Sequence, residues 1–155
     1  MVRAKKTRQT MTGNAPTFAT LFLRVFLPFA LAYFLSYIFR GVNAVIFPYL
    51  ERDIGITAGD LGLLTSAFFL VFAGCQPLLG VMLDRYGPRR VQVVLLAVAA
   101  AGSALFGLSL SLGELIVARA LIGLGFAAGL MAAIKAITIW YPARHWGLIL
   151  SLIHI

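Results

Sequence analysis

Charged residues, and acidic ones above all, are scarce in this chain. Of its 155 residues only 12% are charged, five of them Asp or Glu, while 61% are hydrophobic and the mean hydropathy is +0.97. A soluble domain is about one quarter charged, and a core of this size could not bury so much apolar side chain. The composition therefore excludes a single water-soluble domain and places most of the chain in lipid.

Cysteine is almost absent, since Cys75 is the only one. One cysteine cannot form an intrachain disulfide, which excludes a disulfide-stapled secreted domain. The sequence also has no metal-ligand cluster, no nucleophile paired with a base and no glycine-rich phosphate loop. We therefore expect no enzymatic activity, no cofactor and no metal.

The apolar stretches each approach the ~20 residues that a helix needs to cross a bilayer. They cover residues 25–47, 61–83, 91–112 and 115–139, and a fifth begins near Gly147. The first is too long an apolar run for a cleaved signal peptide. The sequence thus predicts an all-α integral membrane protein with four transmembrane helices and the start of a fifth.

Basic residues account for the net charge of +8, and they lie between the apolar runs rather than on one face of a domain. This distribution disfavours nucleic acid as a partner and is typical of a topology signal. One side of the predicted spans offers only Arg52, whereas the other carries Arg3, Lys5, Lys6, Arg8, Arg24, Arg85, Arg89, Arg90 and Arg144. The positive-inside rule makes the richer side cytoplasmic, including the flexible tail expected over residues 1–18. We expect a multi-pass protein of the plasma (bacterial inner) membrane.

Three cations fall inside the predicted spans, where each costs about 2.5–3.5 kcal/mol on insertion scales. They are Arg40, Arg119 and Lys135, and the spans contain no acid to pair with them. Lys135 is close enough to Trp140 for its side chain to extend to the headgroups, and Arg119 is placed about one turn inside its span. Arg40 is deeper, roughly 10 Å from the outer end of its helix.

Polar side chains around Arg40 share one face of the first predicted helix. At about 100° per residue they span an arc of about 120°, and they are Tyr33, Ser36, Tyr37, Arg40 and Asn43. In a membrane such a stripe faces the protein interior or a water path, and the opposite face should meet lipid. That opposite face consists of Leu35, Phe39, Val42 and Ile46.

The stripe suggests a binding site for an anion. A guanidinium offers forked donors that suit a carboxylate or phosphate, and tyrosine hydroxyls can add to them. We therefore take Arg40, Tyr33, Tyr37 and Asn43 as candidate substrate-binding residues. The alternative is an interhelical hydrogen-bond cluster that holds no ligand.

The second predicted helix carries a narrow face of small residues that ends in an acid. Ala73, Pro77, Gly80 and Asp84 recur at spacings of three and four, which predicts that another helix packs there. Residues 80–90 read Gly-Val-Met-Leu-Asp-Arg-Tyr-Gly-Pro-Arg-Arg. This segment resembles the signature loop between helices two and three of the major facilitator superfamily: Gly, three residues, Asp-Arg, any residue, Gly, any residue, then two basic residues.

A second segment, residues 119–125, reads Arg-Ala-Leu-Ile-Gly-Leu-Gly and is similar to a helix-four motif of the same family. It departs from that motif at Ile122, where the family usually has Gln. The resemblance covers about residues 20–149. It implies a secondary transporter of about twelve helices, in which two six-helix halves alternate around a central site.

The resemblance also implies roles for particular residues. The first motif would contribute to a latch that closes the cytoplasmic side between the halves. Its residues are Gly80, Asp84, Arg85, Gly87, Arg89 and Arg90. The alternative is that the basic residues of the loop determine the membrane topology and nothing else. The second would contribute to ion coupling or to structural pairing; its residues are Arg119, Gly123 and Gly125.

A narrower likeness concerns the first outer loop. Arg40, followed by Pro48-Tyr49-Leu50 and Gly59-Asp60-Leu61-Gly62, is similar to organic-phosphate and organic-anion carriers, in which an arginine at this place binds the substrate. The expected function is therefore transport of a small organic anion, coupled to an ion gradient or to exchange. The expected partners are that anion, a coupling ion, the lipid bilayer and the carboxyl-terminal half of the same protein.

Two other functions remain open. One is a drug–proton antiporter of the same superfamily, although cationic drugs usually require a membrane carboxylate, which these spans lack. The other is a four-helix membrane scaffold or small dimeric exporter, although small exporters rely on a membrane Glu in the first helix, where this chain has Arg40.

The final six residues, Leu-Ser-Leu-Ile-His-Ile, match the translation of a transposon end used in sequencing libraries. We therefore expect residues 150–155 to be adapter-derived and the natural reading frame to continue beyond them.

Overall fold

The computed structural model describes residue 20 and residues 22–154, with side chains described as far as residue 151. In this part of the chain every regular element is helical. Four helical segments there are long and apolar enough to cross a membrane; they are Phe22–Ile54, Ala58–Tyr86, Pro88–Leu108 and Leu112–Trp140. The expected tail at residues 1–18 lies outside the described residues.

The first span consists of a short π-helix, η1 (Phe22–Phe26), and the long helix α2 (Leu27–Ile54). Pro48 lies inside α2, where its ring removes one backbone hydrogen bond without ending the helix. The helix ends where Gly55 adopts a left-handed conformation with φ 75°, which a glycine reaches without steric cost. The helix therefore extends beyond the apolar span expected at residues 25–47.

The second span, α3 (Ala58–Tyr86), begins at a reciprocal cap. The backbone N–H of Thr57 donates to a carboxylate oxygen of Asp60 at 2.8 Å, and the N–H of Asp60 donates to the Thr57 hydroxyl at 3.3 Å. Each bond satisfies a backbone donor that a helix start leaves without a partner. At the other end Gly87, with φ 81°, joins α3 directly to α4 (Pro88–Leu108).

The fourth span is interrupted near its middle. The sequence predicts one helix over residues 115–139, but the structure has α5 (Leu112–Phe126) and α6 (Gly129–Trp140), separated by a turn at Ala127 and Ala128. Glycines flank this turn on both sides, and glycine has a low helix propensity. The expected single helix is thus two helices that follow each other across the membrane.

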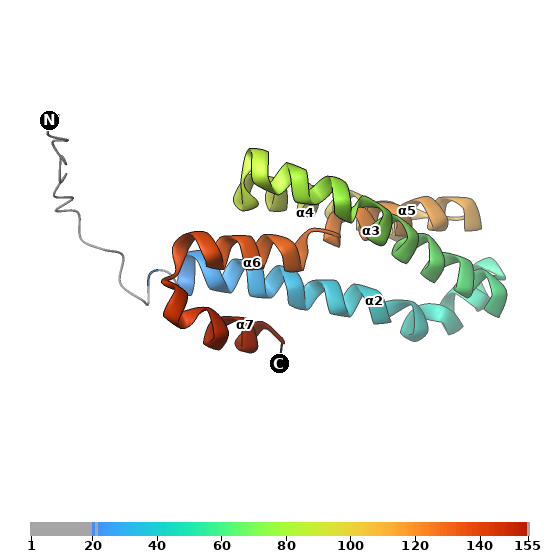
Figure 1. Ribbon diagram of the computed structural model, residues 1–155. Helices are drawn as coiled ribbons and strands as arrows, with labels where there is room; N and C mark the ends of the chain where they lie inside the picture. Colours follow the sequence, from blue (N-terminus) through green and yellow to red (C-terminus); the bar gives the residue numbers. More distant parts are fainter. Residues whose placement is uncertain (1–19, 21, 155) are drawn as a thin grey trace, which may run out of the picture.

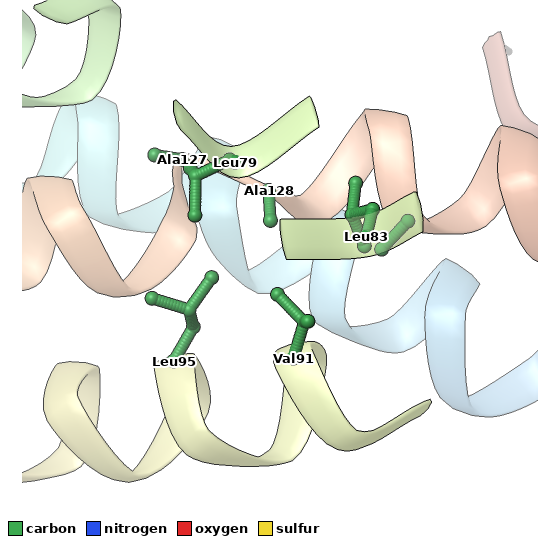
Figure 2. Close-up of a cluster of buried hydrophobic side chains, with 7 residues drawn as sticks. Leu79, Leu83, Val91, Leu95, Ala127 and Ala128 are labelled. Carbon is green, nitrogen blue, oxygen red and sulfur yellow. The ribbon is translucent and has the colours of Figure 1, made fainter. Parts of the chain in front are cut away.

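The interruption packs closely between α3 and α4. Ala127 and Ala128 lie in one buried cluster with Leu79 and Leu83 of α3 and Leu95 of α4 (Figure 2). Alanine side chains are small enough for the backbone of the turn to approach both helices. The cluster therefore anchors the fourth span at the point where it changes from α5 to α6.

The spans run up and down in alternation, with α5 beside α3 and α4, and α6 beside the first half of α2 (Figure 1). A short 3₁₀ turn, η2 (Ala143–His145), leads into α7 (Trp146–His154), which packs in one buried cluster with the start of the first span and with α6. Residues 150–154, in the segment expected to be adapter-derived, continue α7. The fourth span thus contacts the other three spans, α5 mainly through α3 and α4, and α6 mainly through α2 and α4.

Candidate functional site

The polar stripe predicted on the first helix is mostly turned into the protein. Tyr33, Ser36 and Asn43 of α2 are buried, and Arg40 is half-buried. Tyr37 is the exception, because 52% of its surface is exposed. Arg40 therefore lies at the boundary between the packed interior and an open side of the helix.

The guanidinium of Arg40 lies between two aromatic rings. Its Cζ atom is 5.0 Å from the ring centroid of Tyr37 and 4.7 Å from that of Phe72 on α3. Its Nε is buried and has no hydrogen-bond partner among the described residues. Ring faces attract a cation but do not accept forked hydrogen bonds as a carboxylate does. This arrangement holds the guanidinium in place and leaves donors for an anionic ligand.

The two tyrosines of the stripe contact each other. The hydroxyl oxygens of Tyr33 and Tyr37 are 3.0 Å apart, and their rings meet edge to face with centroids 5.0 Å apart. Because Tyr37 also lies under Arg40, the buried Tyr33 fixes the ring on which the cation rests. The candidate residues Tyr33, Tyr37 and Arg40 are thus brought together as one chain of contacts.

Asn43 belongs to a different environment. Its amide nitrogen donates to the hydroxyl of Thr65 on α3 at 3.2 Å, and that hydroxyl donates to the carbonyl of Leu61 at 2.9 Å. Asn43 is only 3% exposed. The structure therefore places this candidate in a bond between α2 and α3 rather than on the open side with Tyr37.

The opposite face of α2, which we expected to meet lipid, is partly covered by protein. Phe39, Val42 and Ile46 line a cavity of about 280 Å³ whose other walls come from α4 and α5. The Phe39 ring also packs against Phe126, with centroids 5.2 Å apart. Only Leu35 of this face is exposed. A single-helix pattern cannot show that α2 is packed on two sides.

Arg119 lies in that cavity and is 1% exposed. Its Nη1 donates to the backbone carbonyl of Phe39 at 2.9 Å, and its Cζ lies 5.6 Å from the ring centroids of both Phe68 and Phe106. Arg119 therefore does not extend to the headgroups. Because α5 begins at Leu112, Arg119 is about two turns inside the helix, and its side chain turns inward to α2.

The glycines of the second motif allow the helices around Arg119 to touch. A Cβ atom on Gly123 would overlap the backbone carbonyl of Phe68 on α3, and one on Gly125 would come within 2.5 Å of the backbone nitrogen of Ala99 on α4. Such contacts are too short for any side chain. Gly123 and Gly125 therefore permit the close packing of α5 against both neighbouring helices.

Lys135 and Asp84 form an ion pair at the opposite end of the bundle. The Lys135 Nζ lies 2.5 Å from a carboxylate oxygen of Asp84, and their side chains are 40% and 70% exposed. This acid lies just outside the apolar span expected at residues 61–83, so the sequence did not show it as a partner of Lys135. The helix α3 continues past its apolar span, so Asp84 sits on its last turns, within reach of the lysine on α6.

The remaining residues of the first motif lie at the junction of α3 and α4. Gly87 makes the turn, and Arg85, Arg89 and Arg90 are exposed around it. A Cβ on Gly80 would meet nothing within 4 Å, so the small-residue face of α3 has open space at this position. The structure thus presents the loop basics and Asp84 together on one end of the bundle.

Sequence reasoning did not identify the aromatic residues of α3 as part of the site. Phe68 and Phe72 are stacked with centroids 6.0 Å apart and an interplanar angle of 13°. Arg119 lies against the first ring and Arg40 against the second. Their spacing of four residues places both on one face of a helix, but nothing in the sequence shows which helix face meets the cations.

Neither guanidinium group forms an ion pair with a carboxylate among the described residues. All acidic residues lie at helix ends or in the turns between helices; they are Glu51, Asp53, Asp60, Asp84 and Glu114. The interior of the described bundle thus contains two cations and no acid. A region of this kind attracts anions.

The sequence profile of the Major Facilitator Superfamily matches residues 29–155. The chain belongs to the major facilitator superfamily. Its membership agrees with the all-helical fold, the four candidate spans and the loop motif at the end of α3. This confirms the family and the all-α membrane fold expected from the sequence.

Similar proteins in this superfamily are named as transporters of anions. The chain is 34% identical to a probable sulfoacetate transporter of Cupriavidus necator over 80% of this chain and 29% of that protein. It is 27% identical to a nitrate/nitrite transporter of Picosynechococcus sp., over 75% and 22% of the two proteins. It is 32% identical to a hexuronate transporter of Escherichia coli, over 71% and 26%. The chain spans less than a third of each relative, and no solved structure gives a significant match.

Proposed function

We propose that this chain forms the first four transmembrane helices of a secondary active transporter that moves a small organic anion by alternating access. One observation carries the proposal: the half-buried guanidinium of Arg40 lies between Tyr37 and Phe72 with no acid beside it. The names of the similar proteins, which specify sulfoacetate, nitrate or nitrite, and hexuronate, support an anionic substrate.

The geometry favours a substrate with a carboxylate or sulfonate at one end. Such a group can accept the parallel N–H bonds of Arg40, since ring faces do not accept forked hydrogen bonds and the Nε of Arg40 has no partner among the described residues. Tyr37 is exposed beside it and its hydroxyl is already in contact with that of Tyr33. The tyrosine pair can therefore add a hydrogen bond to a second polar group of the same anion.

The coupling of this transport is to an ion gradient or to exchange with another anion. The alternative of a drug–proton antiporter has less support, because the described interior contains no carboxylate to attract a cationic drug. We also place the amino terminus in the cytoplasm and the protein in the plasma (bacterial inner) membrane. The basic residues at the junction of α3 and α4 support that orientation.

We assign the end of α3 to the cytoplasmic latch of the transporter. Asp84 already pairs with Lys135, and the exposed Arg85, Arg89 and Arg90 surround the turn at Gly87. These groups leave several unpaired cations on one end of the bundle. They are available to contact a second, carboxyl-terminal half when the cytoplasmic side closes.

Uptake by the full-length transporter that contains this segment tests the role of Arg40. Cells that express Arg40→Lys or Arg40→Gln should accumulate radiolabelled sulfoacetate or galacturonate at least about thirty-fold more slowly, because losing a charged partner costs about 2–5 kcal/mol. Arg52→Lys, a change at the exposed outer end of α2, is the matched control and should leave uptake unchanged. The amount of each variant in the membrane fraction is measured in parallel. Normal uptake by both Arg40 variants would refute the proposal.

A further inference from the structure

Arg119 is a buried cation that the proposed transport site does not use. It is 1% exposed, and its one hydrogen bond among the described residues runs from Nη1 to the carbonyl of Phe39. Its Nε is buried and has no partner there. A guanidinium carries five N–H donors, so most of its capacity for hydrogen bonding is unused.

The surroundings of Arg119 offer no negative charge. Phe68 and Phe106 face its guanidinium at 5.6 Å, and every acidic residue of the chain lies at a helix end or in a turn. A charge that is buried without a partner is costly unless something compensates it. Arginine cannot avoid this cost by losing its proton, because its intrinsic pKa is too high.

The cavity beside Arg119 has room for a compensating anion. It measures about 280 Å³, whereas about 10–15 Å³ is enough to hold one water molecule. Apolar side chains of Phe39, Val42 and Ile122 form most of its wall. Apart from Arg119 the only polar side chain in the lining is Ser103, whose hydroxyl donates to the carbonyl of Ala99 at 2.8 Å.

This lining determines the class of anion that fits. The guanidinium is the only group in the wall with free donors, because the Ser103 proton is already used. Phosphate, sulfate or a dicarboxylate would bury several oxygens without donors, which is costly. A compact, monovalent anion with weak hydration needs only one charged donor group. We propose that the cavity binds one small inorganic anion of the halide class, held by Arg119.

The proposed halide site is separate from the site at Arg40. The stacked rings of Phe68 and Phe72 lie between the two guanidinium groups, each of which contacts a different ring. Arg119 faces the cavity between α2, α4 and α5, whereas Arg40 lies toward the open side of α2. The two sites can therefore be tested independently.

Thermal unfolding of the full-length protein in detergent tests the halide site, with chloride as the probe. Chloride is titrated at constant ionic strength in a buffer without organic anions, so that screening does not change and no carboxylate competes at Arg40. The unfolding midpoint of the unaltered protein should rise with chloride and then level off, because an ion that binds only the folded state stabilises it. Arg119→Gln should raise the half-saturating chloride concentration at least about tenfold, and Arg40→Gln, the matched control, should leave it unchanged.

A second variant covers the case in which Arg119→Gln does not fold. Val42→Glu keeps Arg119 but places a carboxylate in the same cavity, where it takes the place of the anion, and it should abolish the chloride response. The proposal is overturned if the unaltered protein shows no saturable response, which would mean that water or a carboxylate from elsewhere in the protein occupies the cavity. It is also overturned if Val42→Glu keeps the response, or if the response is lost with Arg40→Gln instead.

Discussion

Arg40 and Arg119 are both guanidinium groups in the membrane-spanning part of the chain, but their environments differ. Arg40 is half-buried beside an exposed tyrosine, whereas Arg119 is buried and lines a cavity between α2, α4 and α5. Each contacts one of two stacked phenylalanine rings on α3. Both cations therefore lie against aromatic rings, and they differ mainly in access, while Arg119 also donates to a backbone carbonyl.

This contrast explains how one helix can support two functions. A ligand that must enter and leave needs a cation at an accessible boundary, whereas a resident ion needs a cation that is protected from exchange with solvent. The two faces of α2 supply these two environments. Arg40 projects from one face, and Phe39 and Val42 on the other face line the cavity of Arg119. The backbone of Phe39 joins them, because its carbonyl accepts the hydrogen bond of Arg119.

The largest effect on stability is expected from adding a Cβ atom to the glycines near the two cations, because the space around these glycines differs most. Gly123, one turn beyond Arg119, has no room for a Cβ atom, whereas Gly41, next to Arg40, has nothing within 4 Å. Gly123→Ala should destabilise the full-length protein by about 1–3 kcal/mol or more through overpacking against α3. Gly41→Ala should instead stabilise it by up to about 1 kcal/mol, through the better helix propensity of alanine.

Thermal unfolding in detergent measures both changes, and their opposite signs are the essential result. If Gly123→Ala were neutral, the contact of α5 with the Phe68 backbone would be wrong. If Gly41→Ala were strongly destabilising, the side of α2 beside Arg40 would be packed rather than open.

The next largest effect is expected from Asp60, which sequence similarity places in the same outer-loop motif as Arg40. In the structure its carboxylate caps α3 by accepting the N–H and hydroxyl protons of Thr57, at 2.8 Å and 2.7 Å. Asp60→Asn should cost about 1 kcal/mol of stability, the typical value for a helix cap, and should leave the KM for anion uptake unchanged. A raised KM at normal stability would show that Asp60 shares the role of Arg40.

The sequence was sufficient to predict the helical membrane fold and the family. Apolar runs near the length of a bilayer crossing and the motif that contains Asp84 and Gly87 are local patterns, and both can be read from consecutive residues. The interruption at Ala127 was not predicted, because it depends on how closely α5 approaches α4 at Gly125. Hydropathy averages over such a turn and does not detect it.

The environment of the site was only partly predictable for the same reason. Helical spacing grouped Tyr33, Tyr37 and Arg40 correctly, since one helix determines their arrangement. It could not show that Phe39 faces Arg119, or that Asn43 bonds to α3, because these contacts join residues far apart in the chain. Periodicity identifies a face of a helix but does not identify what covers it.

A smaller effect is expected from the ring beneath Arg40. Phe72→Leu keeps an apolar side chain but removes the ring face that lies 4.7 Å from the guanidinium. A cation–π contact at such a site contributes about 0.5–1 kcal/mol, so the KM for anion uptake should rise about two- to five-fold. Phe68→Leu, the matched change beside Arg119, should leave that KM unchanged. Equal effects of the two changes on KM would contradict the separation of the two cations.

The smallest effect is expected from the third cation, Lys135, which differs from both arginines because it has an acid beside it. Its ion pair with Asp84 is 40% and 70% exposed on the two side chains, and exposed pairs contribute about 0.2–1 kcal/mol. Lys135→Gln should therefore lower stability by no more than this, and added salt should reduce the difference. A double-mutant cycle with Asp84→Asn in the full-length protein measures the coupling. A coupling above about 2 kcal/mol would mean that the pair is buried as Arg119 is. Lys135 would then not differ from the two arginines in its exposure to solvent.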